Sequence, residues 1–168
     1  MNLRQQLGQV LRGRVCVMGL GNVEYGDDGS GIHLAASLIG AGIPHVISVG
    51  NTPERHLRRV ADAKYDRVLF VDAVDVGAEP GSAVLLSVAE ISTRFPQVST
   101  HKISLGLLAR WAEENGVGEV WLLGVQPGST RPGDRLSQPV QTTLGAFARC
   151  WRASLRDRHT LLSASAAR

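Results

Sequence analysis

The chain has 168 residues, of which 43% are apolar and 20% are charged. This length fits one domain, and the apolar content is sufficient for a buried core, so a globally disordered chain is excluded. No apolar run approaches the roughly 20 residues of a membrane-spanning helix, and residues 1–10 lack the apolar stretch of a secretory signal. We therefore expect a cytoplasmic protein that has no membrane partner.

The net charge is +3, and the basic residues are almost all arginines that are scattered along the sequence. Because aromatic residues that would stack on bases are few, we expect no nucleic-acid partner. The basic residues instead predict a solvated surface or a docking face for an acidic protein. Cys16 and Cys150 lie far apart and form no metal-binding or disulfide motif, so we expect both to be buried, reduced thiols.

Short apolar runs alternate with stretches of helical periodicity along the chain. The runs predict strands at residues 14–20, 45–49, 67–71, 83–87 and 119–125. The periodic stretches predict helices at residues 28–39, 53–63 and 104–115, and a last helix that Ser137 can cap. This alternation is typical of an α/β domain with a mostly parallel sheet. We place that domain at residues 1–156 and predict a disordered tail at residues 157–168.

Polar residues follow the predicted strands at the points where ligands usually bind, since open α/β sheets hold their ligands at the carboxyl ends of the strands. Asp27 and Asp28 come after the first strand, and Asp72 ends the third. His101 follows the fourth strand and its loop, and Gln126 follows the fifth. Carboxylates and one imidazole are therefore expected to converge at one edge of the sheet.

The pair Gly19-x-Gly21 is similar to the start of a dinucleotide-binding fingerprint, but Glu24 replaces the third glycine that this fingerprint requires. A phosphate ligand is also disfavoured by charge. Asp27 and Asp28 stand at the predicted start of a helix, where they would repel a pyrophosphate. Ionised carboxylates at a strand end favour a cation instead, so we reject dinucleotide binding.

Asp28, Asp72 and His101 would together offer two oxygen ligands and one nitrogen ligand. Such a mixed set suits borderline ions such as zinc or nickel and leaves positions open for water or substrate. The residues equally allow that Asp28 caps a helix and that His101 is an ordinary capping or surface histidine. Asp72 slightly favours the metal site, since a carboxylate next to the apolar run 68–71 needs a compensating partner.

The sequence GLGNVEYGDDGSG at residues 19–31 matches in full the pattern G-x-G-N-x-x-x-G-D-[DE]-G-x-G and resembles the endopeptidases that mature nickel–iron hydrogenases. Further blocks that resemble this family follow in order at Gly50–Glu54, Val71–Ala73, Ser99–His101, Gly124–Pro127 and Ser137–Pro139. The resemblance covers about residues 15–155, and the Gln-Pro pairs at 126–127 and 138–139 are most like the branch that serves hydrogenase 3. Glu24 departs from the family, where an apolar residue is more frequent, and we expect its side chain to face the cleft.

The resemblance implies a five-stranded twisted sheet with helices on both faces, of the phosphorylase/hydrolase-like kind. It also implies an endopeptidase that removes a short C-terminal peptide from the nickel-loaded large-subunit precursor of a nickel–iron hydrogenase. The precursor then supplies nickel as the recognition element, so we expect no tightly bound cofactor. By the motif match, the metal-contacting residues are Asp28, Asp72 and His101, of which the two aspartates are also catalytic. The substrate-binding residues are Gly21, Asn22, Gly50 and Gln126.

The sequence leaves the chemistry of the cut open. Cys16 lies inside a predicted strand and Ser30 has no neighbouring base, so hydrolysis by an activated water is favoured over a covalent intermediate. Either a divalent cation polarises the scissile carbonyl, or Asp28 or Asp72 acts as the general base. Two alternatives are a non-catalytic metal-binding maturation chaperone on the same fold and an unrelated peptidase, such as one that acts on spore proteins.

Overall fold

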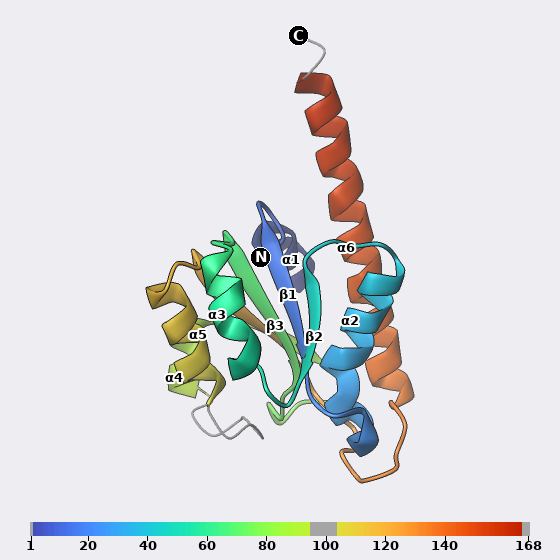
Figure 1. Cartoon of the computed structure of the whole chain (residues 1–168). Coiled ribbons are helices and arrows are strands. Elements are labelled where there is room, and N and C mark those ends of the chain that lie inside the picture. Colours follow the sequence, from blue (N-terminus) through green and yellow to red (C-terminus); the bar gives the residue numbers. More distant parts are fainter. Residues whose placement is uncertain (1, 95–103, 166–168) are drawn as a thin grey trace.

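The computed structural model describes residues 2–94 and 104–165, in which a five-stranded sheet lies between two layers of helices (Figure 1). The strands are β1 (Val15–Leu20), β2 (Val46–Gly50), β3 (Arg67–Ala73), β4 (Ala83–Ser87) and β5 (Glu119–Val125). The helices are α1 (Leu3–Val10), α2 (Ser30–Gly40), α3 (Glu54–Asp62), α4 (Val88–Arg94), α5 (Leu105–Glu114) and α6 (Gln138–Ser165), together with the 3₁₀ helix η1 (Val23–Gly29).

The strand order β2-β1-β3-β5-β4 creates a switch point in the sheet. The strands β2, β1, β3 and β5 are parallel, and β4 pairs antiparallel to β5. After β1 the chain forms β2 on one side of it, and it then returns to form β3 on the other side. The loops that leave β1 and β3 therefore diverge, and ligands of open α/β sheets bind in the crevice at such a point.

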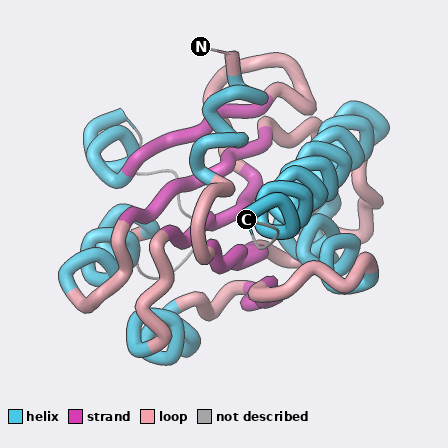
Figure 2. The backbone as a smooth tube through the Cα atoms, turned by 90° about the horizontal axis from the view of Figure 1, so that it is seen from above, coloured by secondary structure: helices cyan, strands magenta, loops and turns pink. Residues whose placement is uncertain are grey.

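Alternating side chains of the strands fill two separate cores, one on each face of the sheet. Cys16 and Met18 of β1 point into the core under α3, α4 and α5, whereas Val15 and Val17 point into the core under α1, α2 and α6. Figure 2 shows helices on both sides of the strands. Both faces are covered, which explains why the strands read as continuous apolar runs rather than alternating ones.

The predicted fold class is confirmed, and each predicted strand is present with its ends shifted by no more than two residues. The helices α1 and α4 and the 3₁₀ helix η1 were not predicted. The direction of β4 also matters for the site. Because β4 is antiparallel, its end lies at the edge opposite to the carboxyl ends of the other strands. The chain must pass through α4 before it reaches the segment with His101, which lies outside the described residues.

The last helix has a helical backbone to Ser165, and the tail predicted from residue 157 falls within its last turns. Extending a formed helix adds one backbone hydrogen bond for each residue that is ordered, which favours continuation. The division at residue 156 stays a prediction. At the start of this helix, the Ser137 hydroxyl donates a hydrogen bond to the carboxylate of Asp27 at 2.7 Å.

The two cysteines differ in burial. Cys16 is fully buried in β1, as predicted, whereas Cys150 on the flank of α6 is only half-buried. Both are free thiols. Within the part of the chain that the structure describes, no helix combines the length and the apolar character that crossing a membrane requires.

Candidate active site

Glycines allow the loop after β1 and the start of α2 to lie directly on the sheet. A Cβ atom at Gly31 would collide with the carbonyl oxygen of Val71 in β3, and one at Gly19 would collide with the carbonyl oxygen of Gly31. The first turn of α2 therefore packs over β1 and β3 at the switch point. This close approach brings the loop that carries Asp28 next to the end of β3, where Asp72 lies.

Asp28 and Asp72 border the same short piece of backbone, Gly21–Asn22. The Asn22 N–H donates to Oδ2 of Asp28 at 2.9 Å. A Cβ atom at Gly21 would lie 3.6 Å from Oδ1 of Asp72 and would collide with the carbonyl oxygen of Asp28. These contacts and ordinary bond lengths hold the two carboxylates within about 10 Å of each other. The structure thus brings two of the three predicted metal-contacting residues to one place.

The two carboxylates differ in exposure. Asp72 is 2% exposed, and its Oδ1 accepts a hydrogen bond from the Ala73 N–H at 2.9 Å. Asp28 is half-buried and lines a hollow of about 370 Å³ together with Asn22, Tyr25, Asn51 and Thr130. Amide and hydroxyl groups around a carboxylate can hydrogen-bond to a polypeptide backbone. The hollow is therefore suited to a peptide that approaches Asp28.

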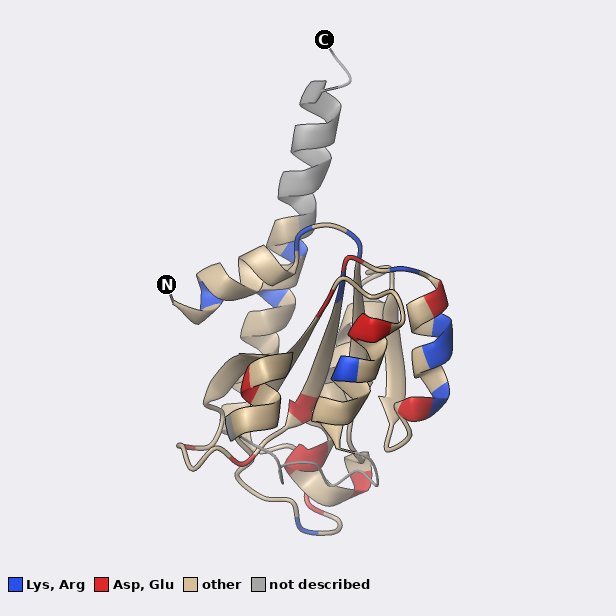
Figure 3. Cartoon of the chain, turned by 90° about the vertical axis from the view of Figure 1, so that its left-hand side faces the viewer, with Lys and Arg blue, Asp and Glu red and all other residues tan. Residues whose placement is uncertain are grey.

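Acidic groups predominate around this edge even though the whole chain has a net charge of +3. Figure 3 shows more red than blue segments at the lower end of the molecule, where the carboxyl ends of the parallel strands lie. Clustered carboxylates attract cations and disfavour anionic ligands. The local charge thus supports the rejection of a dinucleotide ligand.

Gly21 and Gly50, both predicted to bind substrate, connect the loops that follow β1 and β2. The Gly21 N–H donates to the Gly50 carbonyl oxygen at 3.2 Å, and both residues have positive φ angles, of 110° and 60°. This link places Asn51 at the hollow, where it faces Asn22 from the neighbouring loop. Direct contact of either glycine with substrate stays a prediction.

Gln126, also predicted to bind substrate, braces the loop after β3. Its Oε1 accepts hydrogen bonds from the N–H groups of Val76 and Ala78 at 2.8 and 3.3 Å, and its Nε2 donates to Asp75 at 3.2 Å. The Gly77 N–H and, to a smaller extent, Gln126 lower the pKa of Asp75 by hydrogen bonding to its carboxylate. Both polar atoms of Gln126 are thus engaged within the protein, and its role toward substrate stays a prediction.

Asp27 does not share the surroundings of Asp28, although the sequence placed both at the start of one helix. Asp27 is fully buried, and its Oδ2 accepts hydrogen bonds from the Gly128 N–H, the Ser129 N–H and the Ser137 hydroxyl at 2.7, 3.2 and 2.7 Å. Its Oδ1 accepts from the Ser137 N–H at 2.7 Å. Asp27 therefore joins η1 to the segment between β5 and α6, and it lies outside the polar hollow.

The backbone of η1 explains this separation. Tyr25 and Gly26 leave helical geometry, with Gly26 at a φ of 57°, and the Asp27 N–H donates to the Ser129 carbonyl oxygen at 2.9 Å. The resulting kink directs adjacent side chains to different surroundings. Sequence reasoning missed the role of Asp27, because Asp27 and Asp28 stand side by side between Gly26 and Gly29 and nothing in the pattern distinguishes them.

Glu24 differs from its predicted position. Its side chain is exposed and does not line the hollow beside Asp28. Both of its backbone groups form hydrogen bonds. Its N–H donates to the Asn22 side chain at 2.9 Å, and its carbonyl oxygen accepts from the Gly133 N–H at 2.8 Å. The orientation follows from these hydrogen bonds, which point the carboxylate of Glu24 toward solvent.

The candidate nucleophiles are poorly suited to covalent catalysis. Burial raises the pKa of the Cys16 thiol to about 12, so the reactive thiolate is scarce near neutral pH. The Ser30 hydroxyl is buried and forms no hydrogen bond within the described part of the chain, so no base is in reach to activate it there. Hydrolysis by an activated water stays a prediction.

The predicted metal set is represented only in part. Within residues 2–94 and 104–165, no three His, Cys, Asp or Glu side chains are grouped to hold a metal ion. His101 lies outside the described residues, so the set of Asp28, Asp72 and His101 stays a prediction. Ser104, just beyond the undescribed segment, caps α5 by accepting a hydrogen bond from the Leu107 N–H at 3.2 Å.

The open α/β sheet has two carboxylates and a polar hollow at its switch point. The protein therefore belongs to the class of α/β proteins that bind a ligand at the carboxyl ends of the strands. Comparison with known proteins identifies the family within this class. The family model for hydrogenase maturation protease matches residues 33–149. The chain belongs to the hydrogenase maturation protease family and is a hydrolase of the endopeptidase type.

Individual relatives agree with this assignment. The hydrogenase 3 maturation protease of Escherichia coli K12 is 33% identical over 73% of this chain and 78% of its own length. The crystal structure of the maturation protease HycI from Thermococcus kodakarensis has a TM-score of 0.79 at 30% identity and covers 90% of this chain and 99% of its own. The solution structure of the Escherichia coli endopeptidase HycI has a TM-score of 0.70 at 27% identity, with coverages of 81% and 87%.

Proposed function

We propose that this endopeptidase removes a C-terminal peptide from the large-subunit precursor of a nickel–iron hydrogenase, and that nickel carried by the precursor is the element it recognises. The observation that carries the proposal is the position of Asp28 and Asp72, which border Gly21–Asn22 at the switch point beside a polar hollow. The similarity to hydrogenase 3 maturation proteases supports the choice of substrate.

In this proposal the nickel ion belongs to the substrate. Asp28 and Asp72 supply oxygen ligands from two loops, and His101 supplies a nitrogen ligand according to the sequence motif. Such a set suits a borderline ion and leaves coordination positions for the ligands of the precursor. Binding of the ion by both proteins aligns the scissile bond over the hollow, so the protease needs no tightly bound cofactor of its own.

The cut itself uses a water molecule. Asp28 is the better placed of the two carboxylates to accept a proton from water, because it is half-buried at the hollow whereas Asp72 is nearly inaccessible. The polar groups of Asn22, Asn51 and Thr130 hold the peptide backbone by hydrogen bonds. Closing the hollow with substrate excludes bulk water and strengthens these interactions.

The first test replaces the three proposed ligands one at a time, as Asp28→Asn, Asp72→Asn and His101→Ala. Each variant is incubated with nickel-loaded precursor, and the product is measured by gel shift and intact mass. We expect a loss of at least about 100-fold in cleavage rate with the fold retained by circular dichroism. Cleavage at the wild-type rate by all three variants would refute the site.

The second test compares nickel-loaded with nickel-free precursor at equal concentration. Recognition of the ion predicts cleavage of the loaded form only. Equal rates for both forms would reject recognition of nickel without rejecting the protease activity. Binding of the loaded precursor with no cleavage by the wild-type protein would instead favour a non-catalytic maturation chaperone. We place this reaction in the cytoplasm, consistent with two cysteines that remain free thiols.

A further inference from the structure

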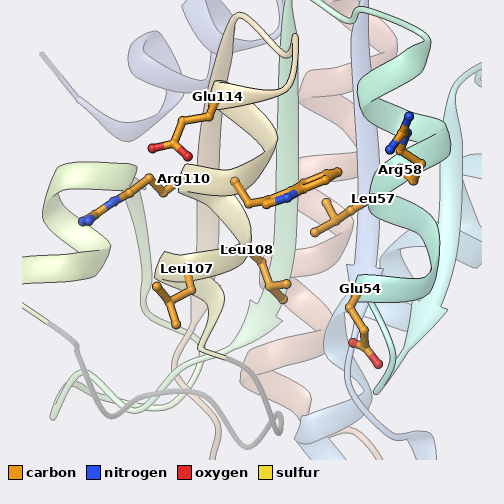
Figure 4. A pocket seen from close by; sticks show the side chains of 8 residues that line it. Glu54, Leu57, Arg58, Leu107, Leu108, Arg110 and Glu114 are labelled. Carbon is orange, nitrogen blue, oxygen red and sulfur yellow. The ribbon is translucent and has the colours of Figure 1, made fainter.

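A second depression lies beside the proposed active site, between α3 and α5. It has a volume of about 540 Å³ and is lined by Glu54, Leu57, Arg58, Leu107, Leu108, Arg110, Trp111 and Glu114; we call it the α3/α5 groove. Figure 4 shows Leu57 from α3 and Leu108 from α5 pointing between the two helices. These two leucines are buried and form the floor.

Two large apolar side chains of the groove are exposed to solvent. Leu107 is 61% exposed and Trp111 is 36% exposed, both on α5. Exposed apolar side chains that gather over an apolar floor offer a surface that a partner can cover. Aromatic residues in such positions contribute strongly to binding when a partner covers them.

The groove is continuous with the active-site edge. Asn51 lines the hollow beside Asp28, and Glu54, only three residues later, lines the groove. The helices α3 and α5 both run from the carboxyl edge of the sheet toward the opposite edge, since α3 follows β2 and α5 precedes β5. The groove therefore begins at the edge where the substrate is cut and leads away from it.

The exposed large apolar residues of the described chain also indicate the occupant. They are Val23, Tyr25, Ile39, Leu107 and Trp111. Val23 and Tyr25 belong to η1, which carries Asp28, and Leu107 and Trp111 belong to the groove, so all except Ile39 lie in one of these two regions. A protein substrate whose tail enters the hollow would cover both regions at once.

The charges on the rim set the chemistry of the segment that fits. Arg58 is ion-paired with Asp62 at 3.2 Å, whereas Arg110 donates to the neutral Ser92 hydroxyl of α4 at 3.4 Å and keeps its charge, so one rim cation stands against two rim carboxylates. Glu54 and Glu114 have no ion pair within the described residues. A segment with apolar side chains in its middle and basic side chains at its ends would therefore complement the groove.

We propose that the α3/α5 groove docks an amphipathic segment of the precursor body, with basic ends and an apolar middle, while the C-terminal tail of the precursor occupies the hollow. The inference rests on the proposed function, since it names the surface that holds the same substrate. Docking away from the scissile bond contributes affinity without touching the reacting atoms. It therefore acts on KM and leaves kcat unchanged.

The test uses Leu107→Ser, with Ile39→Ser as the matched control, because Ile39 is 49% exposed on α2 in the other helical layer. Cleavage of nickel-loaded precursor is followed by intact mass over a range of precursor concentrations. We expect Leu107→Ser to raise KM about tenfold with kcat within about twofold of wild type, and Ile39→Ser to leave both within about twofold. Both side chains are exposed, so both variants should keep the wild-type thermal midpoint.

The failures of the two proposals are distinguishable. If the wild-type protein does not cleave the precursor, the proposed function fails. If it does, but Leu107→Ser keeps the wild-type KM, the docking inference fails alone.

A photoreactive amino acid at position 107 gives a second measurement that needs no turnover. Cross-linking to the precursor is expected from position 107 and not from position 39. Cross-linking to a second copy of this chain, or none, would overturn the inference.

Discussion

Two adjacent aspartates of η1 serve different regions of the molecule. Asp27 is buried at a junction where four hydrogen bonds from Gly128, Ser129 and Ser137 saturate its carboxylate. Asp28 borders an open hollow and accepts one hydrogen bond, from the Asn22 N–H. All acceptor positions of the first carboxylate are used within the fold, whereas the second has acceptor positions that face the hollow. Acidity and position in the sequence therefore do not distinguish the two carboxylates, whereas the number of hydrogen bonds that each accepts does.

The largest effect on stability is expected at Asp27. Asp27→Ala would leave several N–H and O–H donors at the junction without their acceptor, at a cost of about 3 kcal/mol in the free energy of unfolding. Asp28→Ala removes a single half-exposed bond and should cost less than about 1 kcal/mol. Urea unfolding of both variants measures the difference. Equal losses of unfolding free energy would contradict the view that Asp27 stabilises the fold and that Asp28 does not.

The division between the two aspartates also marks the limit of sequence reasoning. Apolar runs and helical periodicity were sufficient for the strands, the fold class and the edge at which Asp28 and Asp72 meet. Neither local pattern reports the kink at Tyr25 and Gly26, after which the Asp27 N–H donates to the Ser129 carbonyl oxygen. The partners of Asp27 lie more than 100 residues away, so their hydrogen bonds depend on how the β5–α6 segment folds back.

The direction of β4 was beyond prediction for the same reason. The apolar run 83–87 identifies a strand but not its orientation, which depends on pairing with β5 almost 40 residues later. Gln126 likewise follows a strand, as predicted, yet its side chain is bound by Val76 and Ala78 of another loop. Motif positions thus located the edge of the sheet, and long-range hydrogen bonds decided what each side chain does there.

An intermediate effect is expected at the glycine that separates Asp28 from Asp72. Gly21→Ala places a Cβ against the Asp28 carbonyl oxygen at a φ of 110°, so the backbone must shift. We expect a loss of about 2 kcal/mol and a strong loss of cleavage, because the shift moves a carboxylate of the hollow.

Gly50→Ala is the matched control for this change. Gly50 also has a positive φ, but a Cβ there would meet only the Gly21 carbonyl oxygen at 3.9 Å. The cost should be about 1 kcal/mol, from the backbone conformation alone, with a smaller loss of cleavage than Gly21→Ala causes. Thermal unfolding and precursor cleavage measure both variants. If Gly50→Ala reduced cleavage as much as Gly21→Ala, close contact with Asp28 would not explain the effect.

The smallest effect on cleavage is expected at Gln126, whose side chain is hydrogen-bonded within the protein although the motif predicts that it binds substrate. If its side chain mainly braces the loop after β3, Gln126→Ala should cost about 1 kcal/mol and leave KM for the precursor unchanged. If it binds substrate as predicted from the motif, KM should rise.

The same variant changes the pKa of Asp75. It removes the weaker of the two hydrogen bonds that lower this pKa, so the pKa should rise toward its ordinary value. The Gly77 N–H keeps part of the lowering. An NMR titration of the Asp75 carboxyl carbon reports the brace directly. An unchanged pKa of Asp75 together with a raised KM for the precursor would show that Gln126 binds substrate and does not brace the loop.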